Sequence, residues 1–161
     1  MSKQIRNGAK GALLDVYEKA IEELITVVSN IPNSALTVPL DVKTTDVNCK
    51  TIQSILSHVI SSGYGYAISI QNLKFKNLDR PEKSFHENVS EYIEDLTKVF
   101  NFTETVFNEI HDHELEQSDN ALKIKTSWGQ IYDIEQITEH AIVHILRHKR
   151  QMENIKINLM K

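Results

Sequence analysis

The sequence predicts an all-α fold, a four-helix bundle with long connections. Apolar residues recur with the 3.6-residue period of an amphipathic helix in four segments of about 20–26 residues each. A length of 161 residues with 40% hydrophobic content suits one domain, over residues 1–161, with one sizeable core. The connections are all longer than a tight antiparallel turn requires, which leaves room for one crossover between helices.

The first two helices are delimited by clear signals. We expect the first from about Gly11 to Ile31, because Pro32 cannot continue it. A polar stretch follows, and the second helix should run from Thr51, as N-cap, to about Leu73. Gly63 and Gly65 each weaken this helix by up to ~1 kcal/mol relative to Ala. They indicate close packing or open space beside a pocket.

The second half of the chain predicts two more helices. Lys74 to Glu87 is interpreted as a connection, followed by a third helix from about Asn88 to Ile110. Ser84–Glu87 fits a capping box, so a start one turn earlier is an alternative. Leu122–Ser127 alternates like a short strand or extended loop. The fourth helix should begin at Asp133, with Gln136 as its capping-box partner, and continue to about Asn158.

Each predicted helix has an apolar stripe that we expect to face the core. The inward residues are Leu13, Tyr17, Ala20, Leu24, Val28 and Ile31 in the first helix; Ile52, Ile55, Val59, Gly63, Tyr66, Ile70 and Leu73 in the second; Val89, Tyr92, Leu96, Val99, Phe100, Thr103, Phe107 and Ile110 in the third; and Ile137, Ala141, Ile145, Met152, Ile155 and Leu159 in the fourth.

Charge and composition exclude several classes of function. The net charge is −4, and the 18 basic residues are spread along the chain, so no nucleic-acid-binding footprint is present. No segment approaches the ~20 apolar residues of a membrane span, and no signal-peptide pattern follows the first residues. A single cysteine, Cys49, excludes an internal disulfide and a cysteine-based zinc site. We therefore expect a cytoplasmic protein.

Three histidines in the fourth helix, His140, His144 and His148, are spaced four residues apart. Residues at this spacing lie about 5–6 Å apart on one helix face, so two imidazoles can converge on one ion. In projection His148 lies inside the apolar stripe, His144 at its border and His140 farther round. One histidine on an apolar face is usually a core residue satisfied by a hydrogen bond. Two unpaired ones would cost on the order of 1–3 kcal/mol each, and a bound metal satisfies both.

A neighbouring helix should supply another ligand, and His58 at the edge of the second helix's stripe is the natural candidate. His86, His111 and His113 fall in or beside connections, where solvated side chains are expected. His140 remains a rival of His148, although its position favours the pocket wall. Three imidazoles with an open fourth position are typical of a catalytic rather than a structural site. Zinc or nickel is the favoured divalent ion, and iron or manganese also suits imidazole.

Other metal motifs are missing. No Glu is followed three residues later by His, as di-iron bundles require, and there is no HExxH sequence. No Ser-His-Asp order, glycine-rich phosphate loop or carboxylate pair is present, and no general base can be identified. Glu139 should face solvent, and Cys49 is interpreted as an ordinary small residue.

Three segments together resemble the DinB-like superfamily of metal-binding four-helix bundles: Thr51–His58, Trp128-Gly129 and His144–Gln151. The similarity covers essentially the whole chain in helix order, although only the three-histidine pattern is specific. It implies that His58, His144 and His148 are the metal ligands. Lys149-Arg150 stands where the family more usually has Arg-Gly, which makes the substrate surface less predictable. The resemblance also makes a homodimer plausible.

Members of that superfamily include thiol-dependent transferases and isomerases that use bacillithiol, mycothiol or glutathione. The sequence therefore predicts a metal-dependent hydrolase or thiol-dependent transferase with a small-molecule substrate and, for the latter, a low-molecular-weight thiol. Pocket or supporting residues would be His140, Ser62, Tyr66, Trp128 and Gln151, with Tyr64 as a further aromatic candidate. Two alternatives stay open: a non-catalytic metal-binding or stress-response protein, and a helical interaction module with buried histidines.

Overall fold

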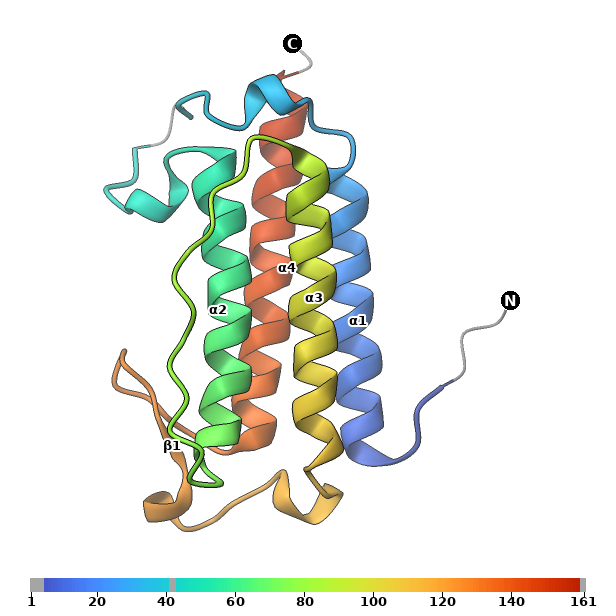
Figure 1. Ribbon diagram of the computed structural model, residues 1–161, viewed down its shortest axis with the longest axis vertical. Coiled ribbons are helices and arrows are strands. Elements are labelled where there is room, and N and C mark those ends of the chain that lie inside the picture. Colours follow the sequence, from blue (N-terminus) through green and yellow to red (C-terminus); the bar gives the residue numbers. More distant parts are fainter. Residues whose placement is uncertain (1–4, 41–42, 160–161) are drawn as a thin grey trace.

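The computed structural model describes residues 5–40 and 43–159 of the chain. Within them, four long α-helices lie side by side as a bundle: α1 (Gly8–Val28), α2 (Ile52–Asn72), α3 (Val89–Asn108) and α4 (Ile134–Leu159) (Figure 1). The short elements are the 3-10 turns η1 (Asn33–Ala35), η2 (Val47–Cys49), η3 (Asp112–Glu114) and η4 (Asn120–Leu122) and the strands β1 (Ile124–Lys125) and β2 (Ile131–Tyr132). The prediction of an all-α four-helix bundle is confirmed.

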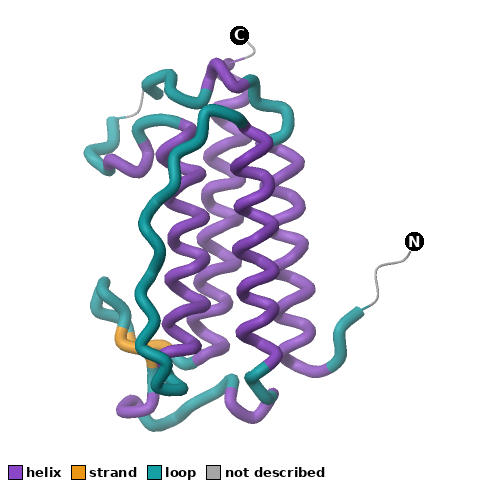
Figure 2. Tube along the Cα trace, viewed as in Figure 1, coloured by secondary structure: helices purple, strands orange, loops and turns teal. Residues whose placement is uncertain are grey.

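The bundle contains a crossover connection. α1 packs mainly against α4 and α3, and α2 against α3 and α4, so α1 and α2 lie diagonally opposite. In Figure 1, α1 and α4 run in one direction and α2 and α3 in the other. The chain between α2 and α3 returns along the length of the bundle without regular structure (Figure 2). We call residues 74–88 the strap. This topology makes α2 and α4 antiparallel neighbours.

Capping boxes fix the starts of the two helices that carry the histidines. The Thr51 hydroxyl accepts from the Ser54 N–H and the Ser54 hydroxyl accepts from the Thr51 N–H, both at 3.0 Å. Asp133 accepts from the Gln136 N–H at 2.9 Å, and the Gln136 side chain accepts from the Asp133 N–H at 3.1 Å. Because these bonds satisfy N–H groups that the first turn leaves free, both helices begin where the sequence predicted.

The start of α3 decides between two predictions. The helix begins at Val89, and the alternative start within Ser84–Glu87 is wrong. The polar groups of that segment are used elsewhere: the N–H of His86 donates to the Tyr92 hydroxyl at 2.9 Å, and the His86 ring bonds the Asp95 carboxylate at 2.7 Å. Contacts to α3 thus hold the segment as part of the strap.

The predicted apolar stripes form the core almost completely. Leu13, Tyr66 and Leu73 are only half-buried. The placement of Leu159 in the stripe is wrong: it is 44% exposed, because the periodic pattern continues to the last residue of α4, past the part that the core covers. A Cβ atom on Gly63 would lie 2.8 Å from a Val99 methyl, so this glycine allows α2 and α3 to pack closely.

A small hairpin precedes α4. The alternating segment Leu122–Ser127 forms a strand only at Ile124–Lys125, and Leu122 itself belongs to η4. The strand pairs with β2, which the sequence analysis did not predict. Gly129, with φ +89°, makes the turn and presents Trp128 at the hairpin tip. No helix in the described part of the chain has the length and hydropathy to cross a bilayer.

Candidate metal centre

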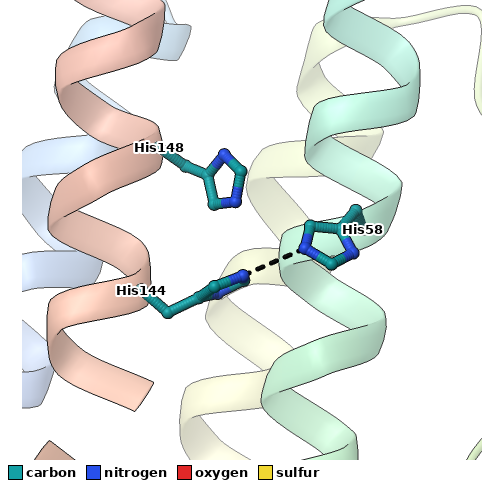
Figure 3. A group of neighbouring side chains, drawn as sticks. All are labelled: His58, His144 and His148. Carbon is teal, nitrogen blue, oxygen red and sulfur yellow. Dashed lines mark hydrogen bonds between the residues drawn. The ribbon is translucent and has the colours of Figure 1, made fainter. Parts of the chain in front are cut away.

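Three imidazoles from two helices face one another between α2 and α4. His58 projects from α2, and His144 and His148 project from successive turns of α4 (Figure 3). Their candidate ligand nitrogens all lie within 4.8 Å of one another, and the Nε2 atoms of His58 and His144 are 3.0 Å apart. The structure therefore brings together the three residues that the sequence predicted as ligands. Their binding of an ion stays a prediction.

Hydrogen bonds set the protonation pattern of the cluster. The Nε2 atoms of His58 and His144 share one hydrogen bond, so one neutral ring donates and the other accepts. His148 Nδ1 lies 2.9 Å from Gln151 Oε1. Since an amide oxygen only accepts, Nδ1 carries the proton and the lone pair of His148 is on Nε2. A neighbour that fixes the tautomer in this way is the usual support of a metal-binding histidine.

Burial keeps the rings neutral. Burial, with smaller contributions from His148 and His58, lowers the pKa of His144 to about 3. Burial likewise lowers the pKa of His58 to about 4, with His148 as the next cause. The pKa of His148 is also lowered, first by burial. All three rings are thus neutral at neutral pH, the charge state in which a ring nitrogen can offer its lone pair to a metal.

The arrangement fits a transition-metal ion. Bonds of about 2.0–2.1 Å to two tetrahedral ligands separate the nitrogens by roughly 3.3 Å, within the range that the cluster spans. In the described part of the chain, the group contains histidines only, with no carboxylate. An all-imidazole donor set suits zinc, nickel, copper or iron better than magnesium or calcium. His144 is buried, whereas His58 and His148 are half-buried, so the cluster is partly exposed to solvent.

His140 and two aromatic residues form a wall beside the cluster. The His140 ring stacks on Trp128, with centroids 5.2 Å apart, and its centroid lies 6.4 Å from that of His144. His140 is not part of the group that could hold a metal, and its role in a pocket wall stays a prediction. Tyr66 lies 5.8 Å from the His144 ring and 5.5 Å from the His140 ring. Burial raises the Tyr66 pKa, and a hydrogen bond with buried Ser62 opposes that shift.

The remaining histidines and Tyr64 lie away from the three-histidine cluster. His86 bonds Asp95 on α3. His111 and His113 stack on each other at 5.6 Å and are exposed, as expected for connections. Tyr64 packs on Phe102 at 5.3 Å, so the structure places it between α2 and α3 instead of at the cluster.

Four charged residues near the cluster were not predicted from the sequence. Arg80 and Lys83 of the strap act with burial to lower the His58 pKa, whereas Asp46 opposes that shift. Burial lowers the pKa values of His140, His144 and His148, and the charge of Arg147 lowers them as well. Helical projection could have found Arg147, which lies three residues after His144. No sequence signal links the strap or the segment before α2 to His58, because their paths depend on the tertiary fold.

We compared the chain with known proteins. No family model matches it, and no curated protein matches it.

Proposed function

We propose that the protein binds a divalent transition-metal ion through His58, His144 and His148 and is a metal-dependent enzyme of the DinB-like type. The observation that carries the proposal is the convergence of three neutral imidazoles from two helices on one accessible point. A zinc or nickel ion is favoured by the donor set. The reaction is hydrolysis or transfer of a low-molecular-weight thiol.

The donor set supports the catalytic form of this proposal. An ion with three protein ligands and an open position lowers the pKa of a bound water or thiol toward neutrality, the activation that both reactions need. The protein contributes the Gln151 side chain, which holds His148 in the tautomer that leaves Nε2 free to bind a metal. It also contributes a half-open wall of Tyr66, Trp128 and His140 against which a small molecule can lie.

One observation favours a non-catalytic alternative. No carboxylate belongs to the histidine group, so the described residues offer no general base in direct contact with it. In this alternative the ion stabilises the bundle or reports its own availability, as in a stress-response protein.

The first experiment measures metal content in protein purified without an affinity tag, before and after separate reconstitution with zinc, nickel, iron and manganese. Trp128 is the only tryptophan and stacks on His140, so its fluorescence should also report binding of nickel at the cluster. We expect about one equivalent of metal in the wild type and much less in a His58→Gln variant. Less than about a tenth of an equivalent after reconstitution would refute metal binding and favour the helical interaction module.

The second experiment tests catalysis. The reconstituted protein is assayed with chromogenic esters and with monochlorobimane plus glutathione, bacillithiol or mycothiol. Turnover that requires both metal and His58 supports the enzyme. Stoichiometric metal without turnover of any ester or thiol pair supports the non-catalytic alternative.

A further inference from the structure

The strap places a guanidinium group beside the histidine cluster. Arg80 Nε donates to the Ser61 hydroxyl at 2.8 Å, which holds the side chain against α2. Ser61 lies three residues after His58, so the two side chains are neighbours on the same helix face. The charge of Arg80 is close enough to help burial lower the His58 pKa.

Gly65 provides the space that Arg80 occupies. A Cβ atom at this position would lie 3.2 Å from Arg80 Cδ, 3.4 Å from Nε and 3.5 Å from Nη1. Because Gly65 also follows His58 by two helical turns, the arginine lies flat along the stripe that leads to the cluster. This contact gives Gly65 a role that differs from the packing role of Gly63.

Arg80 has no acidic partner in residues 5–40 and 43–159. Its only hydrogen bond there is the one to Ser61, and no ion pair involves it. Burial lowers its pKa, and the opposing influence is Tyr66 rather than a carboxylate. A guanidinium that is held in place through Nε and whose two terminal nitrogens lack protein partners is suited to bind a planar oxyanion through parallel N–H bonds.

Arg147 provides a second cation on the opposite helix. Arg147 follows His144 by three residues on α4, so the two side chains are neighbours on one helix face. Arg80 and Arg147 both oppose the rise that burial causes in the Tyr66 pKa. Lys83 adds a third positive charge and Asp46 one negative charge near His58. Three of these four charges are therefore positive, and the Tyr66 and Trp128 rings beside the cluster contact each other with centroids 6.2 Å apart.

We infer that Arg80 and Arg147 form a subsite that binds the carboxylate of a small organic anion beside the three-histidine cluster. This inference rests on the proposed function when it names the substrate class: a small molecule with a carboxylate and an adjoining flat, apolar part. The carboxylate lies between the strap and α4, and the apolar part lies against Trp128.

Calorimetric titration with benzoate tests the subsite, with benzamide as the uncharged probe of the same shape. Both are titrated into metal-free and zinc-reconstituted full-length protein. We expect benzoate to bind and benzamide to bind at least about tenfold more weakly. Arg80→Gln and Arg147→Gln should each raise the Kd for benzoate about tenfold, and Arg80→Lys should recover part of the loss.

The control variants are Lys76→Gln in the strap and Arg150→Gln in α4, each of which removes one exposed positive charge of the same segment. They should leave benzoate binding unchanged. Equal affinities for benzoate in the wild type and both arginine variants would overturn the subsite. Tighter binding of inorganic phosphate than of benzoate would overturn the carboxylate assignment.

The metal-free arm separates this inference from the proposed function. If zinc is not retained but benzoate still binds in an arginine-dependent manner, the metal enzyme fails and the anion subsite stands. If zinc binds with the expected stoichiometry but the Kd for benzoate is the same in the wild type and both arginine variants, the metal centre stands and the subsite fails.

Discussion

Substitution of His58 by Gln should abolish the stabilisation of the protein by zinc. Zinc that binds the folded state only, at 100 times its Kd, stabilises that state by about 2.7 kcal/mol. For a chain of this length, 1 kcal/mol corresponds to roughly 2–4 °C in Tm. Zinc should therefore raise the Tm of the wild type by about 5–11 °C. If loss of one of three ligands weakens binding about 100-fold, the same zinc concentration adds only about 0.4 kcal/mol, or ~1 °C.

The substitution has a smaller effect without metal. His58 and His144 share one hydrogen bond of 3.0 Å, whose loss costs on the order of 0.5–1.5 kcal/mol. The metal-free variant should therefore unfold a few degrees below the metal-free wild type, and the effect of zinc is read as the difference within each variant.

Thermal unfolding followed by far-ultraviolet circular dichroism, on chelator-treated protein with and without zinc, measures both effects. His113→Gln is the matched control, because His113 is exposed and stacks only on His111 at a distance from the cluster. It should keep the full zinc response. An equal zinc-induced shift in the His58→Gln variant and the wild type would refute the assignment of His58 as a ligand.

Three further predictions follow from the same contacts. The folded-state pKa values of His58 and His144, lowered first by burial to about 4 and about 3, lie below the unfolded value of about 6.5. The unfolded state thus binds more protons at mildly acidic pH, so the free energy of unfolding of the metal-free protein should be highest above about pH 6.5 and fall as the pH drops toward 4. Urea unfolding at neutral pH and at about pH 5 measures this difference. Equal free energies of unfolding at the two pH values would contradict the prediction. Gly63→Ala should destabilise the fold by about 1–3 kcal/mol, despite alanine's helix propensity, because its Cβ meets a Val99 methyl at 2.8 Å; a rise in Tm would show that α2 and α3 separate easily. Gln151→Ala should weaken zinc binding about 10–100-fold, measured by chelator competition, because it removes the acceptor that orients the third imidazole; unchanged affinity would assign Gln151 no role at the centre.

Local signals predicted the helices and the histidine spacing. Thr51 and Asp133 start α2 and α4 because each capping box is complete within four residues and needs no tertiary contact. The depth of the rings was not predicted. In projection His148 lay deeper in the apolar stripe than His144, yet His144 is the buried one and His148 is half-buried. Projection does not show that Tyr66 of α2 also lies against His144, with ring centroids 5.8 Å apart.

The crossover explains what local patterns could not predict about the cluster's surroundings. A tight turn after α2 would have left no chain alongside that helix. Instead α2 and α3 run parallel, and the strap must travel back along α2, where Ser57 bonds the Ser84 carbonyl at 2.6 Å and Gln53 bonds the His86 carbonyl at 2.9 Å. These two bonds fix the path of the strap at the level of His58.

Arg80 comes next to the cluster for the same reason. It precedes Ser84 by four residues, and on a chain running antiparallel to α2 that offset brings it to Ser61 and Gly65, below His58. A connection of different length or path would place another side chain there, with no change in the three histidines. The positions of Arg80 and Lys83 thus depend on the crossover, whereas the spacing of His144 and His148 follows from helix periodicity. We therefore expect a bundle with the same histidines and a different strap to keep the three-imidazole cluster but to carry different charged side chains beside it.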